Sequence, residues 1–192
     1  MNKILIGLGI AVLLAGGTVV AANKALPGGL LYGIKLNVNE KVEGALIFSN
    51  QARVEWHIKV AERRLIEAGQ AALKGKFDTE AQAIVLVNFN KHMKGIEEHI
   101  TKLDAEGRTA ETKEVAIKIG QVLATQAESL AYAQGEVQAN ADIETQGSLD
   151  FLYLRVTNSL VAAVNIAAST LIEDEAPNTD DLPPTDEWGR PI

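Results

Sequence analysis

Three histidines, His57, His92 and His99, are the side chains of this sequence best suited to bind a metal ion. His92 and His99 are seven residues apart, so they share one face of any helix that contains both. No His-x-x-x-His or Glu-x-x-His pair stands at the spacing that metal ligands on a helix need. The histidines therefore have two interpretations: a metal site, or boundary residues whose imidazole edges pack against a core.

Two adjacent arginines, Arg63 and Arg64, are the best candidates for binding an anion, because a guanidinium matches carboxylate and phosphate groups with two parallel hydrogen bonds. Acidic residues stand near them, with Glu62 just before and Glu67 four residues after Arg63. Charged pairs at this spacing are ordinarily solvated and contribute roughly a few tenths of a kcal/mol. We therefore predict an exposed helix face here, with Arg63 and Arg64 as candidates for contact with a partner.

No pattern of catalytic residues is present in the sequence. It contains no cysteine, no glycine-rich phosphate loop after a strand, no Gly-x-Ser-x-Gly and no His-Glu-x-x-His. Glu97 and Glu98 are adjacent, so on a helix they point about 100° apart and cannot act on one substrate. We predict that the protein is not an enzyme, that it has no catalytic residue and that it binds no cofactor.

The elements that position these residues are predicted to be helices. Between Ser49 and Lys74, apolar residues recur at alternating spacings of four and three, which is typical of one face of a helix. Ser49 and Asn50 are suitable N-cap residues, and Gly75 is a suitable stop. Asp78 and Thr79 cap a second helix that ends near Glu106, before Gly107. The short linker between the two helices predicts an antiparallel hairpin.

Further helices are predicted on both sides of this hairpin. A shorter helix runs from about Leu30 to Phe48, after the turn signals at Pro27 and the following glycines. Thr109 caps a long helix, Gly147 and Ser148 indicate a break, and a final helix continues to about Ile172. Charged and amide residues interrupt this final helix, so we do not expect it to span a membrane. The predicted fold is an all-α bundle of antiparallel hairpins over residues 23–172.

Residues 4–22 form a run of 19 positions without a charge, which as a helix would span about 28 Å of hydrocarbon. The run indicates export, with residues 1–22 acting either as a signal peptide cleaved after Ala22 or as a retained membrane anchor. Both alternatives place the rest of the chain outside the cytoplasmic membrane, either secreted or anchored there by one N-terminal helix.

The last segment, residues 173–192, has a different composition from the rest. It holds seven acidic residues, one basic residue and four of the five prolines, which is typical of a disordered tail. Trp188 in this tail is a candidate contact for a protein partner. The preceding residues, 1–172, hold 17 basic against 18 acidic side chains, so no basic patch predicts binding to nucleic acid.

Four short motifs carry a resemblance to a known family: Leu26-Pro27-Gly28, Leu31-Tyr32 with Lys35, Glu40-Lys41-Val42 and Ala61-Glu62-Arg63-Arg64-Leu65. The pattern resembles an uncharacterised bacterial family known only as a domain of unknown function. The resemblance covers roughly residues 25–110, and it departs from the usual pattern at Gly29, where an acidic residue is common, and at Gly33, where a proline is common. It implies an extracytoplasmic helical domain behind a membrane or signal segment, and it implies no activity.

Two functions are consistent with these observations. The first is a non-enzymatic interaction or structural module of the bacterial cell envelope, in which the helical body and the acidic tail bind a protein partner. The alternative is an envelope sensor that responds to stress through a small ligand or a metal. A sensor would require Arg63, Arg64 and the three histidines to converge on one pocket, which their spacing in the sequence cannot establish.

Overall fold

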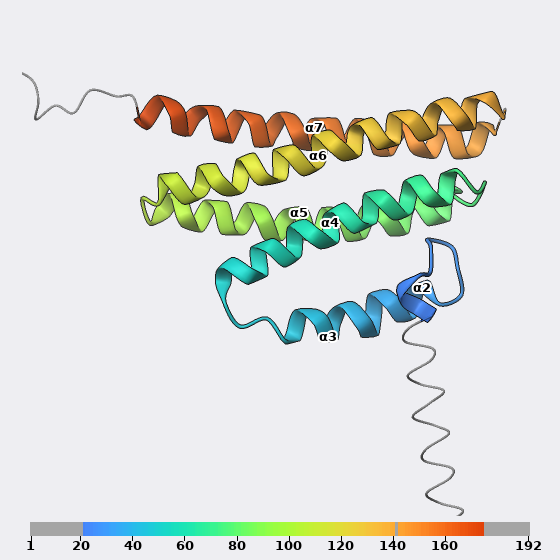
Figure 1. Cartoon of the computed structure of the whole chain (residues 1–192), viewed down its shortest axis with the longest axis horizontal. Helices are drawn as coiled ribbons and strands as arrows, with labels where there is room; N and C mark the ends of the chain where they lie inside the picture. Colours follow the sequence, from blue (N-terminus) through green and yellow to red (C-terminus); the bar gives the residue numbers. More distant parts are fainter. Residues whose placement is uncertain (1–20, 141, 175–192) are drawn as a thin grey trace, which may run out of the picture.

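Four long helices run along one another through most of the computed structural model, which describes residues 21–140 and 142–174 (Figure 1). These helices are α4 (Asn50–Ala72), α5 (Thr79–Ala105), α6 (Thr109–Ala139) and α7 (Ile143–Asp174). No strand occurs among the described residues, so the predicted all-α class is confirmed. α7 continues to Asp174, so the first two residues assigned to the tail are helical.

A shorter helical segment precedes the bundle and lies along its outside, next to α4 (Figure 1). It consists of α2 (Tyr32–Ile34), a turn of π-helix (Lys35–Asn39) and α3 (Glu40–Ala45), and is called the α2–α3 segment below. Residues five apart in an α-helix point about 140° away from each other. In the π-helical turn the backbone N–H of Glu40 bonds to the carbonyl of Lys35, which brings these two residues to the same side of the segment.

The predicted ends of the α4–α5 hairpin are confirmed. The Ser49 side chain accepts a hydrogen bond from the backbone N–H of Ala52 at 3.1 Å, and Asp78 accepts one from Ala81 at 2.8 Å. Gly75 has a φ of 60° and Gly107 a φ of 68°, the left-handed conformation that favours glycine after a helix. Short turns therefore connect α4 to α5 and α5 to α6.

Two predicted boundaries in the second half are wrong. Thr109 does not cap α6, because the residue at the N-cap position is Arg108 and its side chain makes no capping bond. Gly147 and Ser148 do not mark a break, because α7 already begins at Ile143. The break comes earlier, where Asp142 accepts a hydrogen bond from the backbone N–H of Thr145 at 3.1 Å. An aspartate starts the helix, and the glycine lies within it.

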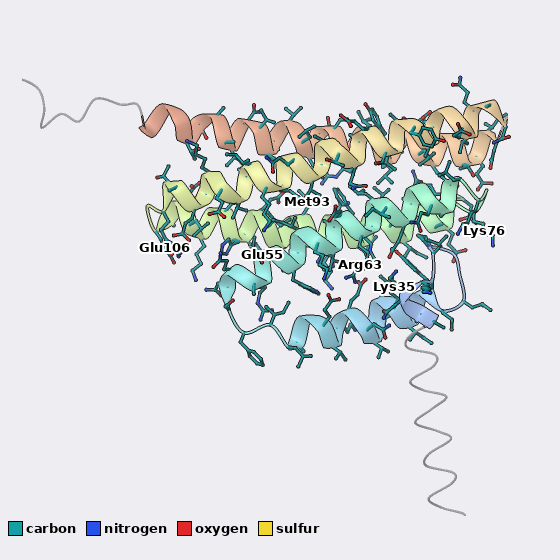
Figure 2. All side chains as sticks on the ribbon, in the orientation of Figure 1. Lys35, Glu55, Arg63, Lys76, Met93 and Glu106 are labelled. Atoms are coloured by element: carbon teal, nitrogen blue, oxygen red, sulfur yellow. The ribbon has the colours of Figure 1, made fainter. Side chains whose placement is uncertain are left out.

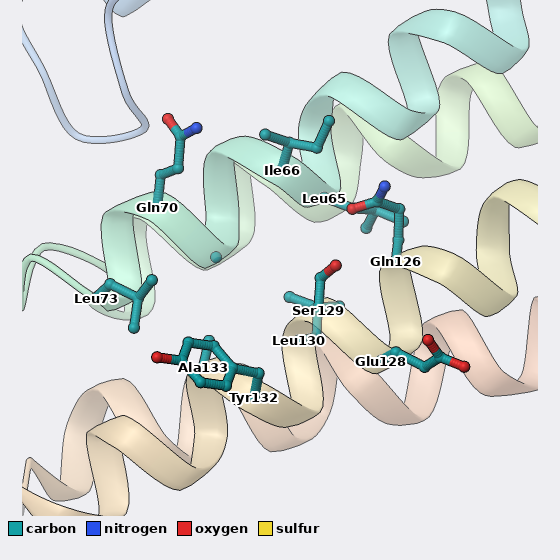
Figure 3. Close-up of a pocket in the computed structure, with 11 residues that line it drawn as sticks. Leu65, Ile66, Gln70, Leu73, Gln126, Glu128, Ser129, Leu130, Tyr132 and Ala133 are labelled. Atoms are coloured by element: carbon teal, nitrogen blue, oxygen red, sulfur yellow. The ribbon is translucent and has the colours of Figure 1, made fainter.

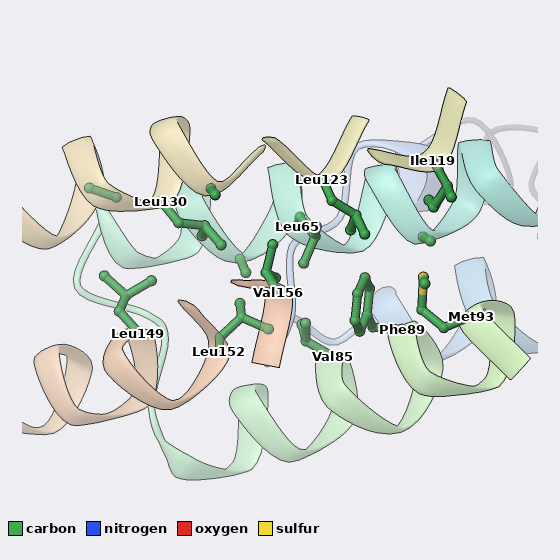
Figure 4. Close-up of a cluster of buried hydrophobic side chains, with 14 of the residues drawn as sticks. Leu65, Val85, Phe89, Met93, Ile119, Leu123, Leu130, Leu149, Leu152 and Val156 are labelled. Carbon is green, nitrogen blue, oxygen red and sulfur yellow. The ribbon is translucent and has the colours of Figure 1, made fainter. Parts of the chain in front are cut away.

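The core lies between the four long helices. α4 packs against α5 and α6, α6 packs against α7, and α5 also contacts α6 and α7. Figure 4 shows side chains from all four helices meeting in this core, among them Leu65, Phe89, Leu123 and Leu152. The apolar faces of α4 and α5 are buried in this core, including Val54, Ile58, Leu65, Val85, Phe89, Met93, Ile96, Ile100 and Leu103.

Within the described part of the chain, Ile143–Thr170 is the one stretch long and apolar enough to cross a membrane, judged by length and composition alone. This finding contradicts the sequence argument, which excluded such a stretch because Asp150 and Arg155 interrupt it. The two charges are too few to lower its average hydropathy below that of a membrane span. The apolar segment predicted at residues 4–22 lies, up to position 20, outside the described residues.

Candidate functional site

Arg64 is the centre of a cluster of charged side chains that joins the α2–α3 segment to α4. Its guanidinium is 0% exposed. One terminal nitrogen, Nη1, donates to the Tyr32 hydroxyl at 2.6 Å, and the other, Nη2, donates to Glu67 at 3.3 Å and to Glu40. The Tyr32 hydroxyl in turn donates to Glu67 at 2.6 Å. The two terminal nitrogens of Arg64 and the Tyr32 hydroxyl are therefore paired within the protein, whereas the buried Nε of Arg64 has no hydrogen-bond partner among the described residues.

Two further basic residues complete this buried charge cluster. Lys35 forms an ion pair with Glu67 and donates to the carbonyl of Ala25 at 3.4 Å. Arg63 lies at the solvent edge, where it bonds to both carboxylate oxygens of Glu43 at 3.2 and 3.4 Å and to Glu40 at 3.3 Å. Figure 2 shows Arg63 extending from α4 toward the segment that carries Lys35. Three cations thus meet three carboxylates, and the cluster has no net charge.

Burial dominates the proton equilibria of the cluster. It raises the pKa of the Tyr32 hydroxyl far above its ordinary value, against the opposing effect of Arg64, so this hydroxyl stays protonated. Burial also raises the pKa of Glu40, although Arg64 and Arg63 both act to lower it. Removing one partner from a buried pair costs about 3–5 kcal/mol, because the other charge is left buried alone. The cluster therefore fixes the position of the α2–α3 segment.

The structure changes the interpretation of the arginine pair. Glu67 is buried, so the prediction of a solvated Arg63–Glu67 surface pair is wrong. Glu67 pairs with Arg64 and Lys35, while Arg63 pairs with Glu43 and Glu40. The guanidinium groups of Arg63 and Arg64 are both occupied by carboxylates of the same chain. An external anion would have to displace a carboxylate from either arginine.

His57 of α4 and His92 of α5 form a second polar contact, 35 residues apart in sequence. Their Nδ1 atoms are 3.0 Å apart, so one ring donates a hydrogen and the other accepts it. The Trp56 ring lies against both imidazoles, with each pair of ring centroids 5.0 Å apart. The hairpin explains this pairing, because His57 lies 18 residues before Gly75 and His92 lies 17 residues after it.

The histidine pair is held in its neutral form. Burial lowers the pKa of His92 from 6.5 to about 3, and His57 contributes in the same direction. The pKa of His57 is also lowered, chiefly by burial and then by Arg53 and Lys91. The His57 ring fits against Gly95 of α5, where a Cβ atom would lie 2.6 Å from two ring atoms. Gly95 therefore permits the close packing of the His57 ring against α5.

His99 does not join the other two histidines. It lines a separate small pocket with Ile58, Leu103 and Arg108, and its pKa is lowered by partial burial and by Arg108. Among the described residues, no group of three or more His, Cys, Asp or Glu side chains is placed to hold a metal ion. Trp188, the remaining candidate, lies outside the described residues. The five described candidates thus divide between the buried charge cluster, the histidine pair and the pocket at His99.

Two apolar surfaces remain outside these polar groups. A groove of about 610 Å³ lies between α4 and α6, with Ile66 and Leu73 on one side and Tyr132 on the other (Figure 3). On α7, more than half of each of four apolar side chains is exposed: Phe151, Leu154, Val161 and Val164. Neither surface brings together groups for acid–base or nucleophilic chemistry. Both can contact apolar groups of another molecule.

Taken together, the fold and its polar groups define a class of protein: a four-helix bundle to which a short N-terminal helical segment is attached by buried ion pairs. The sequence of residues 24–147, more than half of the chain, matches the domain of unknown function DUF5667, and the protein belongs to this family. The buried charge cluster, the histidine pair and the α4–α6 groove all lie within the matched residues. No curated protein and no solved structure matches the chain.

Proposed function

We propose that the protein is a non-enzymatic interaction module of the cell envelope, held at the outer side of the cytoplasmic membrane by residues 4–22 and bound to another protein through α7. The charge-free run at positions 4–22 supports the membrane location. The absence of catalysis is proposed because the sequence contains no recognised pattern of catalytic residues.

The exposed apolar face of α7 is the observation that carries this proposal. Leu154, Val161 and Val164 are exposed and separated by seven and three residues, which places them on one side of the helix. The opposite side of α7 packs into the core through Leu149, Leu152 and Val156. Apolar residues repeated at this spacing on a free helix face suit the docking of a second helix.

Retention of residues 4–22 has support from the residues that follow them. Ala22, after which a signal peptidase would cleave, is buried and lies in a helical turn with its neighbours. The next residue, Asn23, accepts a hydrogen bond from the Asn39 side chain at 2.7 Å. The chain is thus part of the folded domain from Ala22 onward. N-terminal sequencing of protein from membranes should begin at Met1; a start at Asn23 would show cleavage after Ala22 and would refute anchorage by residues 4–22.

A photo-crosslinking experiment with matched positions tests the role of α7. A photoreactive residue at position 161 of the full-length chain should give an adduct with a different envelope protein, because Val161 lies on the proposed docking face. Position 87 is the control, since Val87 is a similarly exposed valine on α5. The substitution Val161→Glu should weaken capture of the same partner, whereas Val87→Glu should not. The same adduct from both positions, or none from position 161, would refute docking through α7.

The metal-responsive alternative has one supporting observation, the contact between His57 and His92. A separation of 3.0 Å between their Nδ1 atoms suits two ligands on one Zn²⁺ or Cu²⁺ ion. The alternative predicts that either metal raises the melting temperature of the protein, and that His92→Gln abolishes this rise while His99→Gln preserves it. A ligand present at about 100 times its dissociation constant adds about 2.7 kcal/mol of stability, which a melting experiment detects.

A further inference from the structure

The α2–α3 segment is amphipathic, but its polar side faces the bundle and its apolar side faces outward. Its inner side, toward α4, carries the polar residues Tyr32, Lys35 and Glu40, all of which are buried. Its outer side carries Val38, Val42 and Leu46, and the exposed fraction of Leu46 is 67%. The flanking residues Leu30 and Phe48 are almost fully exposed. Surface helices of soluble proteins ordinarily turn their apolar side inward.

The buried charge cluster maintains this orientation. If the segment rotated to bury Val38 and Val42, it would withdraw Glu40 from Arg64 and leave a guanidinium buried without its main counter-charge. Trp56 adds a steric constraint, because its ring packs against Gly44 so closely that a Cβ atom there would lie 2.9 Å from the ring. The outward apolar face is therefore a fixed property of the fold.

The charge of the outer face suits an anionic surface. Within residues 30–49, Lys41 is the most exposed charged residue, and it lies beside Val42. The Glu43 side chain is 35% exposed, and Arg63 neutralises its charge. Lys24 and Arg53 are exposed at the two ends of the segment. Lysine at such a position can extend its amine toward phosphate groups while its methylene chain covers apolar surface. Apolar residues interrupted by basic ones are typical of helices that lie in a membrane interface.

The chain reaches this face directly from the apolar run. Residues 4–22 carry no charge, and Asn23 is the next residue. Asn23 lines a hollow of about 650 Å³ together with Val38, Val42 and Leu46. If residues 4–22 cross a bilayer, the chain leaves that bilayer at the edge of the outer face. The stretch of chain between residue 22 and the α2–α3 segment is too short to hold the outer face far from the membrane surface.

From these observations we propose that the outer face of the α2–α3 segment lies on the lipid surface, with Val38, Val42, Leu46 and Phe48 entering the boundary between headgroups and acyl chains, and with Lys41 at the phosphates of anionic lipids. This inference rests on the anchorage proposed above. Figure 1 shows α7 on the side of the bundle opposite the α2–α3 segment. One side of the molecule thus contacts the membrane, and the other is available for the protein partner.

The absence of cysteine allows a direct test with single-cysteine variants of the full-length chain. Val42→Cys and Leu46→Cys report on the outer face, and Val87→Cys is the control on α5. Each variant is spin-labelled and placed in nanodiscs of phosphatidylcholine and phosphatidylglycerol. Collision rates with oxygen, which dissolves in lipid, and with a water-soluble nickel chelate are then measured. Labels at 42 and 46 should favour oxygen several-fold over the label at 87.

The contribution of the basic residue is tested in the same system. Replacing phosphatidylglycerol with phosphatidylcholine should reduce the oxygen preference at position 42, and Lys41→Gln should reproduce that reduction in the mixed lipid. Circular dichroism confirms that each variant retains its helix content. An oxygen preference that is unchanged by both perturbations would overturn the role of Lys41.

Three results would overturn the inference and are distinguishable from one another. Water-like collision rates at 42, 46 and 87 in protein that starts at Met1 would refute lipid contact but leave the anchorage intact. Labels at 42 and 46 that are protected from both reagents would show that protein, such as a second copy of this chain, covers the face. A chain that starts at Asn23 and is absent from membranes would refute both the lipid contact and the proposed anchorage.

Discussion

Acidification from about pH 7.5 to about pH 5 should destabilise the fold through His92. This side chain is 2% exposed, and burial lowers its pKa to about 3. In the unfolded chain its pKa returns to about 6.5, so below that pH the unfolded state binds a proton that the folded state does not. Stability therefore falls as the pH drops below about 6.5, and it continues to fall until about pH 3.

The size of the effect follows from the pH interval. About 1.5 pH units separate pH 5 from the unfolded pKa, which corresponds to a loss of about 2 kcal/mol from His92. The value is insensitive to the folded pKa, provided that this pKa lies well below 5. Protonation of the accepting nitrogen would also place two N–H groups face to face across the 3.0 Å contact with His57. The structure thus offers no favourable position for the added proton.

Urea unfolding of the full-length protein in detergent, followed by circular dichroism at both pH values, measures the loss. His92→Gln should reduce the loss by about 2 kcal/mol, because glutamine does not titrate. Glu40 has a raised pKa and acts in the opposite direction, but it is present in both proteins and cancels in the comparison. His99→Gln is the control, since His99 is only partly buried. An equal pH-dependent loss in His92→Gln and the parent protein would refute the reasoning, as would a pKa near 6.5 for His92 measured by NMR.

Two further predictions concern stability at neutral pH. Arg64→Met should cost about 3–5 kcal/mol in urea unfolding, because it leaves carboxylates buried without their counter-charge. Arg108→Met removes an exposed ion pair and should cost much less, so equal losses would contradict the buried network. Gly95→Ala should lower the melting temperature, because the new Cβ would overlap His57 and overpacking costs about 1–3 kcal/mol of stability. Gly69→Ala has nothing within 4 Å of the new Cβ and should raise the melting temperature, since alanine is favoured over glycine in a helix by about 1 kcal/mol. The same sign for both glycine variants would argue against the packing at His57.

The hairpin was predictable from the sequence because its signals are local. Ser49 and Asp78 cap helices through backbone groups three residues away, and Gly75 needs only its own backbone conformation. The false break at Gly147 arose from the same reasoning. A glycine inside a helix costs only about 1 kcal/mol relative to alanine, which the packing of α7 on α6 offsets. Asp142 was the stronger signal, since its carboxylate caps the helix directly.

The polar clusters were not predictable in the same way, because their partners are distant in sequence. Arg64 pairs with Glu40, 24 residues earlier, a partner that helix periodicity cannot indicate. Periodicity does separate the two arginines, because Arg64 stands three residues after Ala61 and four before Ala68, at the edge of the apolar face. The histidine pair did leave a usable signal. Once a turn is assigned at Gly75, residues at equal distances on either side should lie opposite each other, and His57 and His92 satisfy that rule. A comparison of positions within one helix alone groups His92 with His99 and misses the pairing of His92 with His57.

The buried charge cluster and the outward apolar face have a common origin. An amphipathic segment such as α2–α3 could dock on α4 through either side, and apolar contact alone would favour burial of Val38 and Val42. Hydrophobic contact is not directional, so it would also permit several registers. Ion pairs with a planar guanidinium require one geometry. Burying Arg64 without Glu40 would cost more free energy than the burial of the apolar side chains of this short segment would contribute. Arg64 therefore determines which side of the segment faces outward, and a lipid surface beside residues 4–22 would make that choice favourable.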